Sequence, residues 1–230
     1  MVNKQADRSR ERAREDYLKA IYHLGAGAPV KAVTVARHLR VSRASVSKLR
    51  RVLERDGLLQ AANKRVDALT LTPQGQAIAI RMIRRHRLVE TFLHRSLGVP
   101  LERVHTDAEK IEHSISEDVA RRLAEFLGNP VTDPHGHLIP DSAAHKKSSR
   151  DAPLLSQNAG ERVTVTAIDD RDDKVTRKLV HLGILPGRQV CIVQNQPKLL
   201  RLKVGARTVA VPHAAAASVR CTPAVDGRRA

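Results

Sequence analysis

The sequence predicts a mainly α-helical chain that ends in a small all-β domain. Apolar residues recur every three or four positions through most of residues 8–127, the period of helices that bury one face. Beyond residue 159 the chain carries short runs rich in Val, Ile and Thr, separated by turn residues, which is typical of strands. Residues 141–158, rich in Ser, Ala, Lys and Pro, show no sustained period and are expected to be a linker.

The charge of the chain limits the class of partner. Its 41 Lys and Arg against 24 Asp and Glu leave a formal net charge of +17 over 230 residues, an excess that favours a polyanion, most often nucleic acid. Aromatic residues are only 2%, whereas single-strand and RNA recognition stack bases on aromatic rings. Double-stranded DNA is therefore the expected partner, although a solvated basic surface would give the same count.

The sequence shows no sign of a membrane or secreted protein. No apolar run approaches the roughly 18 residues that span a bilayer, and the segment MVNKQADRSRERARED is polar, without an apolar signal segment. A cytoplasmic location without a membrane partner is expected. Cys191 and Cys221 are too few for a disulfide framework and lack CxxC spacing, so both are expected to be reduced thiols and not metal ligands.

Residues 1–74 are expected to form the DNA-binding domain. A helix over about 8–25 precedes a helix-turn-helix pattern, in which a short apolar helix from Val33 to Leu39 leads into a second helix capped by Ser42. After Asp56-Gly57 the run LLQAANKRVDALTLTPQG predicts two short strands joined by a polar turn. The whole block resembles a winged-helix domain.

The outward side of the second helix offers small hydroxyls and cations, which reach base edges and phosphates in a major groove. An ordinary two-helix corner with a solvated basic face is the alternative, because a helix-turn-helix signal alone is only moderately specific. The candidate DNA-binding residues are Ser42, Arg43, Ser45, Ser47, Lys48 and Arg51 in the helix, and Lys64 and Arg65 in the turn.

Residues 75–140 are expected to form a helical domain. One helix over about 74–96 ends at Gly98 and Pro100, and a second over 101–127 ends at Gly128 and Pro130. Their apolar positions exceed what one pair of helices can bury together, so a homodimer is expected, and its two-fold axis would suit a palindromic operator. The candidates for the dimer interface or internal core are Leu88, Val89, Phe92, Leu93, Val119, Leu123 and Phe126.

Side chains that ligate metals repeat at helical spacing on the same two stretches. His86 and Glu90 share one helix face, and His105, Glu109, Glu112 and His113 share another. Two such stripes facing each other would form a metal site, with Asp16 as a seventh candidate. The alternatives are a core histidine with a hydrogen-bonded neighbour and a solvated glutamate face. A dimetal enzyme would need two Glu-x-x-His motifs, whereas the local motif here is Glu109-x-x-Glu112-His113 and no second copy of it exists.

Residues 159–226 are expected to form a small barrel. ERVTVTAID, RQVCIVQN, LLRLKV and RTVAVP have the composition of short strands, and HLGILPG interrupts them. An acidic run, Asp169, Asp170, Asp172 and Asp173, follows the first of these strands.

Several motifs then form a recognisable series. EDYLKAIYHL, ERDGLL, LTPQG, RHRLVETFL, HTDAEKIEHSISEDVARRL and GNPVTDPHGHLIP resemble, in order and spacing, the iron- and manganese-dependent transcriptional repressors of the diphtheria toxin repressor type. LVHLGILPG resembles the SH3-like (FeoA-like) domain of longer members. The resemblance implies a non-enzymatic regulator of metal-ion homeostasis that binds a palindromic operator as a metal-loaded dimer. It assigns a primary metal site to Asp16, Glu109, Glu112 and His113, and an ancillary site to His86, Glu90, His105 and, from the acidic run, Asp172.

The resemblance also bears on which metal binds. Iron-responsive members carry sulfur ligands at the positions of Asp16 and Glu109, whereas manganese-responsive members carry carboxylates, as here. Carboxylate oxygens suit a hard ion such as Mn²⁺, so Mn²⁺ is expected, with Fe²⁺ the alternative and other divalent metals binding in vitro. One departure is Lys19, where two-manganese members carry a second acid, and an ammonium cannot ligate. A metal-independent winged-helix regulator that responds to a small molecule would leave the metal-ligating stripes without purpose.

Overall fold

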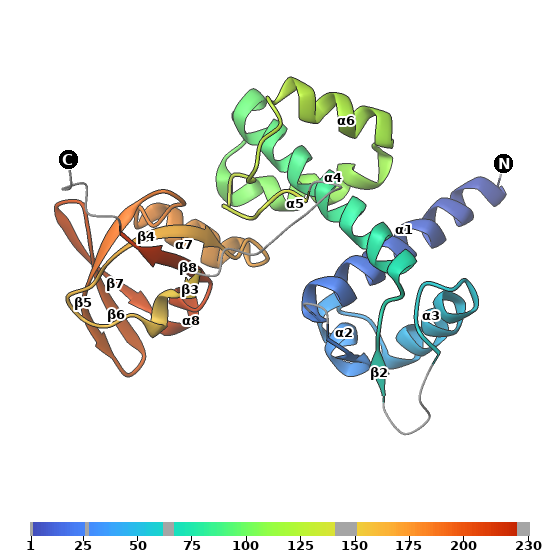
Figure 1. The fold of residues 1–230 in the computed structure, drawn as a ribbon, viewed down its shortest axis with the longest axis horizontal. Coiled ribbons are helices and arrows are strands. Elements are labelled where there is room, and N and C mark those ends of the chain that lie inside the picture. The colour runs from blue at the N-terminus through green and yellow to red at the C-terminus, as the bar shows by residue number, and fades with distance from the viewer. Residues whose placement is uncertain (1, 26–27, 62–66, 141–150, 225–230) are drawn as a thin grey trace. The chain divides into compact units, whose positions relative to one another are not determined.

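The structure is a computed structural model that describes residues 2–25, 28–61, 67–140 and 151–224. It divides into two compact units, Met1–Arg85 and His86–Ala230. Helices and one short two-stranded sheet make up the described chain as far as residue 126, and a six-stranded sheet follows (Figure 1). The predicted order of a helical part and a β domain is confirmed. In the described ranges, no helix has the length and apolar character needed to cross a membrane.

The first unit contains the helix-turn-helix. Its elements are α1 (Val2–Gly25), β1 (Val30–Lys31), α2 (Ala32–Leu39), α3 (Arg43–Arg55), β2 (Ala68–Leu69) and the start of α4 (Pro73–Leu97). Arg40 adopts the left-handed conformation after α2, with φ of 55°, which turns the chain sharply. Ser42 then accepts a hydrogen bond from Ser45 N at 3.1 Å and caps α3. The predicted two-helix pattern around Arg40 and Ser42 is therefore confirmed.

The strands of the wing are short. Leu59 and Leu71 form an isolated antiparallel bridge, Gln60 N donates to Thr70 O at 2.9 Å, and β2 pairs with β1. The turn expected to carry Lys64 and Arg65 lies outside the described residues. Gly75 fixes the join to α4, because a Cβ there would lie 2.2 Å from Leu58 O.

The helical part of the second unit differs from the expected pair of long helices. After α4 come α5 (Leu101–Ile111), the 3₁₀ turn η1 (Glu112–Ser114) and α6 (Glu117–Phe126). The single helix expected over 101–127 is wrong, because Ile115 is extended and Ser116 starts a new helix by accepting a hydrogen bond from Val119 N. Two acids, Glu117 and Asp118, occupy the first turn of α6 and favour that start.

The apolar residues of these helices separate into core and surface. Leu88, Val89 and Leu93 are buried between the helices. Val119 and Phe126 remain 48% and 70% exposed, and the ring of Phe126 lies edge-on to that of Phe92 at 6.1 Å. Part of the candidate dimer interface is thus used within the protomer, and an apolar patch stays open.

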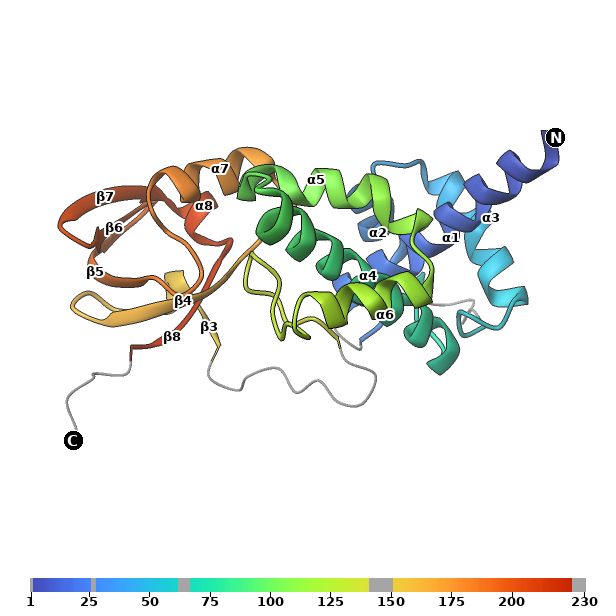
Figure 2. The same ribbon diagram turned by 90° about the horizontal axis from the view of Figure 1, so that it is seen from above.

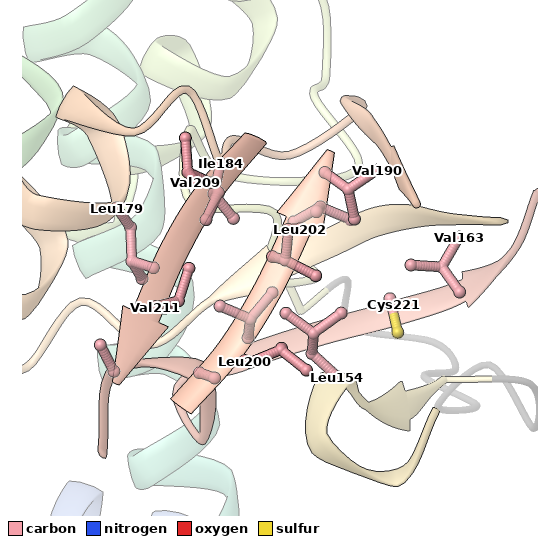
Figure 3. Packing of buried hydrophobic residues seen from close by; sticks show 14 of the residues in the cluster. Leu154, Val163, Leu179, Ile184, Val190, Leu200, Leu202, Val209, Val211 and Cys221 are labelled. Atoms are coloured by element: carbon pink, nitrogen blue, oxygen red, sulfur yellow. The ribbon is translucent and has the colours of Figure 1, made fainter. Parts of the chain in front are cut away.

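The β domain is an antiparallel sheet in the order β3-β8-β4-β5-β6-β7. Alternate residues point inward and form one core, shown in Figure 3, in which Leu200 and Leu202 are fully buried. Bulges at Val165/Ala167 and Ile192/Gln194 help the sheet to curve. The strands are β3 (Ala152–Pro153), β4 (Arg162–Ile168), β5 (Gln189–Gln196), β6 (Leu199–Val204), β7 (Arg207–Pro212) and β8 (Val219–Pro223).

Several parts of this domain were not expected. Residues 141–150 of the predicted linker lie outside the described residues, but 151–158 are not linker. There β3 pairs with β8 and η2 (Leu154–Ser156) buries Leu154 completely, so the domain starts earlier than residue 159. Two helices, α7 (Asp173–His181) and α8 (His213–Ala216), join the sheet, and α7 lies beside α5 (Figure 2).

Candidate metal centre and DNA-reading surface

The predicted ancillary residues lie together in the second unit. His86 and Glu90 are one turn apart on α4, and His86 Nε2 is 3.1 Å from Glu90 Oε1. His105 on α5 brings its Nδ1 to 3.1 Å from His86 Nε2 and 3.2 Å from Glu90 Oε1. Glu90 is fully buried. The three helical side chains therefore converge as the helix spacing predicts.

The C-terminal domain contributes Asp170 to this cluster, and not Asp172. Asp170 is buried, and its Oδ2 lies 3.3 Å from His105 Nδ1. Asp172 is exposed, and its Oδ1 accepts hydrogen bonds from Lys174 N at 2.9 Å and Val175 N at 3.2 Å as the N-cap of α7. The expected role of Asp172 is thus corrected, because its carboxylate is used to start a helix that the sequence analysis missed.

A turn after α6 supplies further side chains that the sequence analysis also missed. His135 Nδ1 lies 3.3 Å from Asp170 Oδ2 and 3.8 Å from Glu90 Oε1. His137 Nδ1 lies 3.4 Å from Asp133 Oδ2. The signal was present in the segment DPHGH, where an acid and two histidines alternate around a glycine.

The backbone holds this turn firmly. Asp133 Oδ1 accepts hydrogen bonds from the backbone N–H of His135 and His137, both at 2.9 Å. Gly136 has φ of 88°, and a Cβ there would lie 1.9 Å from Thr166 O. Ile168 N donates to His135 O at 2.9 Å. Only glycine allows this approach to β4, and the approach carries His135 to Asp170.

Three buried polar atoms in this region lack a hydrogen-bond partner among the described residues: Glu90 Oε2, Asp133 Oδ2 and His135 Nδ1. His135 Nε2 lies 3.0 Å from Leu101 O and donates to it, so in a neutral ring Nδ1 presents a lone pair. That lone pair faces two carboxylates. Buried acceptors that converge without a donor are costly, and a divalent cation would satisfy them. The residues therefore fit a metal ion.

The electrostatics agree with a cation site. Burial raises the pKa of Glu90, but His86 and hydrogen bonds from His105 outweigh it and lower the pKa to about 2. Burial likewise opposes ionisation of Asp170, yet His105 and His137 hold its pKa well below the usual range. Burial lowers the pKa of His105, but hydrogen bonds to Asp170, Glu109 and Glu90 raise it to about 12. Without metal, protons on imidazoles balance the buried carboxylates.

Part of the predicted primary set lies next to this cluster. Glu112 is buried in η1, its Oε2 is hydrogen-bonded to His86 Nδ1, and its Oε1 lies 3.5 Å from His113 Nε2. Glu109 is half-exposed, with Oε1 at 3.5 Å from His105 Nε2. Asp16 lies on α1 in the first unit, where Arg12 Nε is 4.0 Å from its Oδ2. Its participation with Glu109, Glu112 and His113 remains a prediction.

The outward side of α3 carries the expected DNA-binding side chains. Val46 and Leu53 are buried and fix the orientation of the helix. Ser42 Oγ accepts from Ser45 N and lies 2.8 Å from Ser45 Oγ, so Ser42 positions the helix start. Arg50 forms ion pairs with Glu54 and Asp67. The exposed residues are Arg43, Ser45, Ser47, Lys48 and Arg51.

A winged helix-turn-helix followed by a helical domain with buried carboxylates and imidazoles defines a class, the metal-responsive DNA-binding regulators. Comparison with protein families agrees. The iron dependent repressor N-terminal DNA binding domain matches residues 11–66, the iron dependent repressor metal binding and dimerisation domain matches 72–141, and the FeoA domain matches 152–223.

Whole proteins match as well. The iron-dependent repressor IdeR of Mycobacterium leprae (strain TN) is 36% identical over 225 residues, which cover 90% of this chain and 95% of that protein. The solved structure titled "Manganese-dependent transcriptional repressor complex with manganese" has a TM-score of 0.83 at 29% identity and covers 92% of this chain and 100% of its own. The "Crystal structure of T. acidophilum IdeR" has a TM-score of 0.74 at 28% identity, with 91% and 97% covered.

The chain belongs to the iron-dependent repressor family of the diphtheria toxin repressor type. It is a metal-dependent DNA-binding repressor. Because the matching relatives are transcriptional repressors, the alternative of a dimetal enzyme is excluded.

Proposed function

We propose that this repressor is activated by Mn²⁺ and then binds a palindromic operator as a homodimer in the cytoplasm, where its DNA target lies. The chemistry of the donor atoms is the observation that carries the choice of metal. Glu90, Glu112 and Asp170 offer oxygens and His86 and His105 offer nitrogens, while both cysteines lie in the β domain, on β5 and β8. Oxygen and imidazole ligands suit Mn²⁺, and sulfur would favour softer metals.

Fe²⁺ is the second candidate for a specific reason. The relative from Mycobacterium leprae is named an iron-dependent repressor, whereas one similar solved structure is titled as a complex with manganese. Nitrogen and oxygen sites generally bind Mn²⁺ more weakly than Fe²⁺, so selection of Mn²⁺ would depend on coordination geometry and supply.

The proposed ligands form two sets. The primary set is Asp16, Glu109, Glu112 and His113, as the family resemblance implies. The second set is His86, Glu90, His105 and Asp170, supported by their convergence within the second unit. Asp133 and His135 adjoin the second set and share Glu90 with it. A bound ion would supply the positive charge that protons on the imidazoles provide without metal.

We propose that the chain divides into three domains. Residues 1–74 read DNA, residues 75–140 bind metal and dimerise, and the C-terminal domain starts at about residue 151. An ion that takes ligands from Asp16 and from the helical domain favours one arrangement of the two, the one that binds DNA. Such an ion shifts the population only by its differential affinity, and a ~100-fold preference supplies roughly 2.7 kcal/mol.

The homodimer is supported by the apolar patch around Phe126. Val119 and Phe126 are exposed and Phe92 packs edge-on against Phe126. Exposed aromatic residues in a contiguous patch mark interaction surfaces, and a two-fold contact would present two copies of α3 to the half-sites of a palindrome.

The proposal is tested by binding of promoter duplexes to metal-stripped protein, followed by fluorescence anisotropy as each metal is added. Mn²⁺ is expected to tighten binding, with Fe²⁺ compared under anaerobic conditions. Replacing Lys48, an exposed residue of α3, with Ala should weaken DNA binding and leave metal uptake unchanged. Equal DNA affinity of the stripped and metal-loaded proteins would overturn metal activation.

A further inference from the structure

The outer face of the C-terminal sheet carries cations that the metal-activated mechanism does not use. Directly opposed residues of neighbouring strands lie on the same face, and the register sets Arg162, Cys191, Lys203 and Thr208 in one row across β4, β5, β6 and β7. Arg201 lies two positions from Lys203 on β6, and therefore on the same face. The alternating residues point the other way and form the core shown in Figure 3.

This face contains no negative charge. Strands β4, β5, β6 and β7, which are described throughout, have no Asp or Glu. The deficit extends beyond the strands, because the sequence between Asp173 and Asp226 contains nine Lys or Arg and no acid at all. Thr208 lies opposite Lys203 and Gln194 lies opposite Arg201, and the other opposed positions are the uncharged Cys191 and Ala210.

The three cations also lack ionic partners. Arg162, Arg201 and Lys203 are exposed, and no carboxylate of the described residues pairs with any of them. Some cations elsewhere are paired, as Arg121 and Arg122 are with Asp118 on α6. Unpaired like charges on one sheet repel one another and contribute nothing to folding. Their arrangement therefore suits a polyanionic partner.

We propose that this sheet face binds the phosphate backbone of the double-stranded DNA that flanks the operator. Arg, Lys, Thr and Gln side chains all contact phosphates in protein–DNA complexes, and the face carries these residue types beside Cys191 and Ala210. The partner is duplex DNA because the repressor is held at DNA whenever it acts. The inference rests on the proposed function, and it adds a second, sequence-independent contact to the groove reading by α3.

The test compares two triple variants that remove equal charge from the same domain. R162Q/R201Q/K203Q alters the sheet face, and K174Q/R177Q/K178Q alters three exposed cations of α7. Operator affinity is measured with saturating Mn²⁺ over a range of salt concentrations. Removing one cation–phosphate interaction makes the slope of log K against log salt less negative by about 0.9, so the slope of the sheet variant should change by up to ~2.7 for each protomer bound. The α7 variant should keep the wild-type slope within the value of one such interaction.

A second measurement uses two duplexes, one limited to the operator and one extended on both sides. Wild type and the α7 variant should bind the extended duplex more tightly, and the sheet variant should show no such increase. The inference is overturned if both variants change the slope equally, because that result would indicate a general effect of charge. It is also overturned if neither variant changes the slope, the result expected of a face that binds an acidic protein. Failure of the proposed function would differ, because wild-type protein would then show no stimulation by Mn²⁺.

Discussion

Replacing Asp170 with Asn tests whether this carboxylate is a metal ligand, and Asp172, two residues away, serves as the comparison. The change keeps the size of the side chain but removes a buried charge that lies 3.3 Å from the Nδ1 atoms of both His105 and His135. Loss of even an outer partner of a metal site commonly costs 10- to 100-fold in affinity, so we expect at least about 100-fold here, roughly 2.7 kcal/mol. The metal concentration for half-maximal DNA binding should rise in step if this site is coupled to DNA binding.

Asp172→Ala is the matched control. Its carboxylate accepts hydrogen bonds from Lys174 N and Val175 N at the start of α7, so its loss should cost about 1 kcal/mol of unfolding free energy, as for other N-caps. Metal affinity should stay near that of wild type.

Isothermal titration with Mn²⁺, ion counting by mass spectrometry and thermal melts of both variants provide the readouts. A wild-type Mn²⁺ affinity and ion count for Asp170→Asn would refute the assignment. An equal loss for Asp172→Ala would show that the domain as a whole, and not the Asp170 carboxylate, determines metal binding.

Three further predictions follow from the same geometry. The pKa of His105 is raised to about 12, so this ring is protonated near neutral pH and Mn²⁺ must displace its proton. If one proton is displaced, the affinity for Mn²⁺ should fall about tenfold for each pH unit of acidification. Titration calorimetry in buffers of different ionisation heat measures the number of protons released. Gly136→Ala forces a Cβ to within 1.9 Å of Thr166 O at a positive φ, so it should lower the unfolding free energy by about 2 kcal/mol or more and weaken metal binding, whereas an unchanged melt would contradict the strained turn. Phe126→Ser should shift the light-scattering mass toward the monomer and remove the dependence of the melting temperature on protein concentration, with the fold of the protomer kept because Phe126 is 70% exposed within it; a persistent dimer would place the interface elsewhere.

The periodicity of the sequence correctly predicted which side chains are buried or converge where these side chains lie on one face of a helix. Val46 and Leu53 of α3 are buried as their spacing requires, and His86, Glu90 and His105 converge because residues one turn apart share a face. Periodicity did not predict the break between α5 and α6, because the helical spacing of apolar residues continues across Ile115. Ser116, followed by two acids, was the local signal for the new helix.

The side chains that complete the proposed metal centre depend on tertiary contacts, which no local pattern reports. Asp170 and Asp172 have the same chemistry and differ only in that one follows β4 inward and the other caps α7. His135 reaches the cluster because Gly136 lets the turn approach β4, a contact between segments about thirty residues apart in the chain. Spacing along the sequence therefore could not predict that Asp170 and not Asp172 joins the cluster, or that the turn containing His135 lies beside it.

His86 links the two proposed ligand sets through its ring. Its Nδ1 is hydrogen-bonded to Glu112, and its Nε2 lies 3.1 Å from both Glu90 Oε1 and His105 Nδ1. A neutral imidazole carries one proton and can donate from only one nitrogen. When a metal of the second set takes the Nε2 lone pair, the ring proton resides on Nδ1 and is donated to Glu112, a proposed ligand of the primary set. Because this ring of the second set is hydrogen-bonded to Glu112 of the primary set, we expect the free energies of metal binding at the two sets to be coupled, and such coupling acts in both directions.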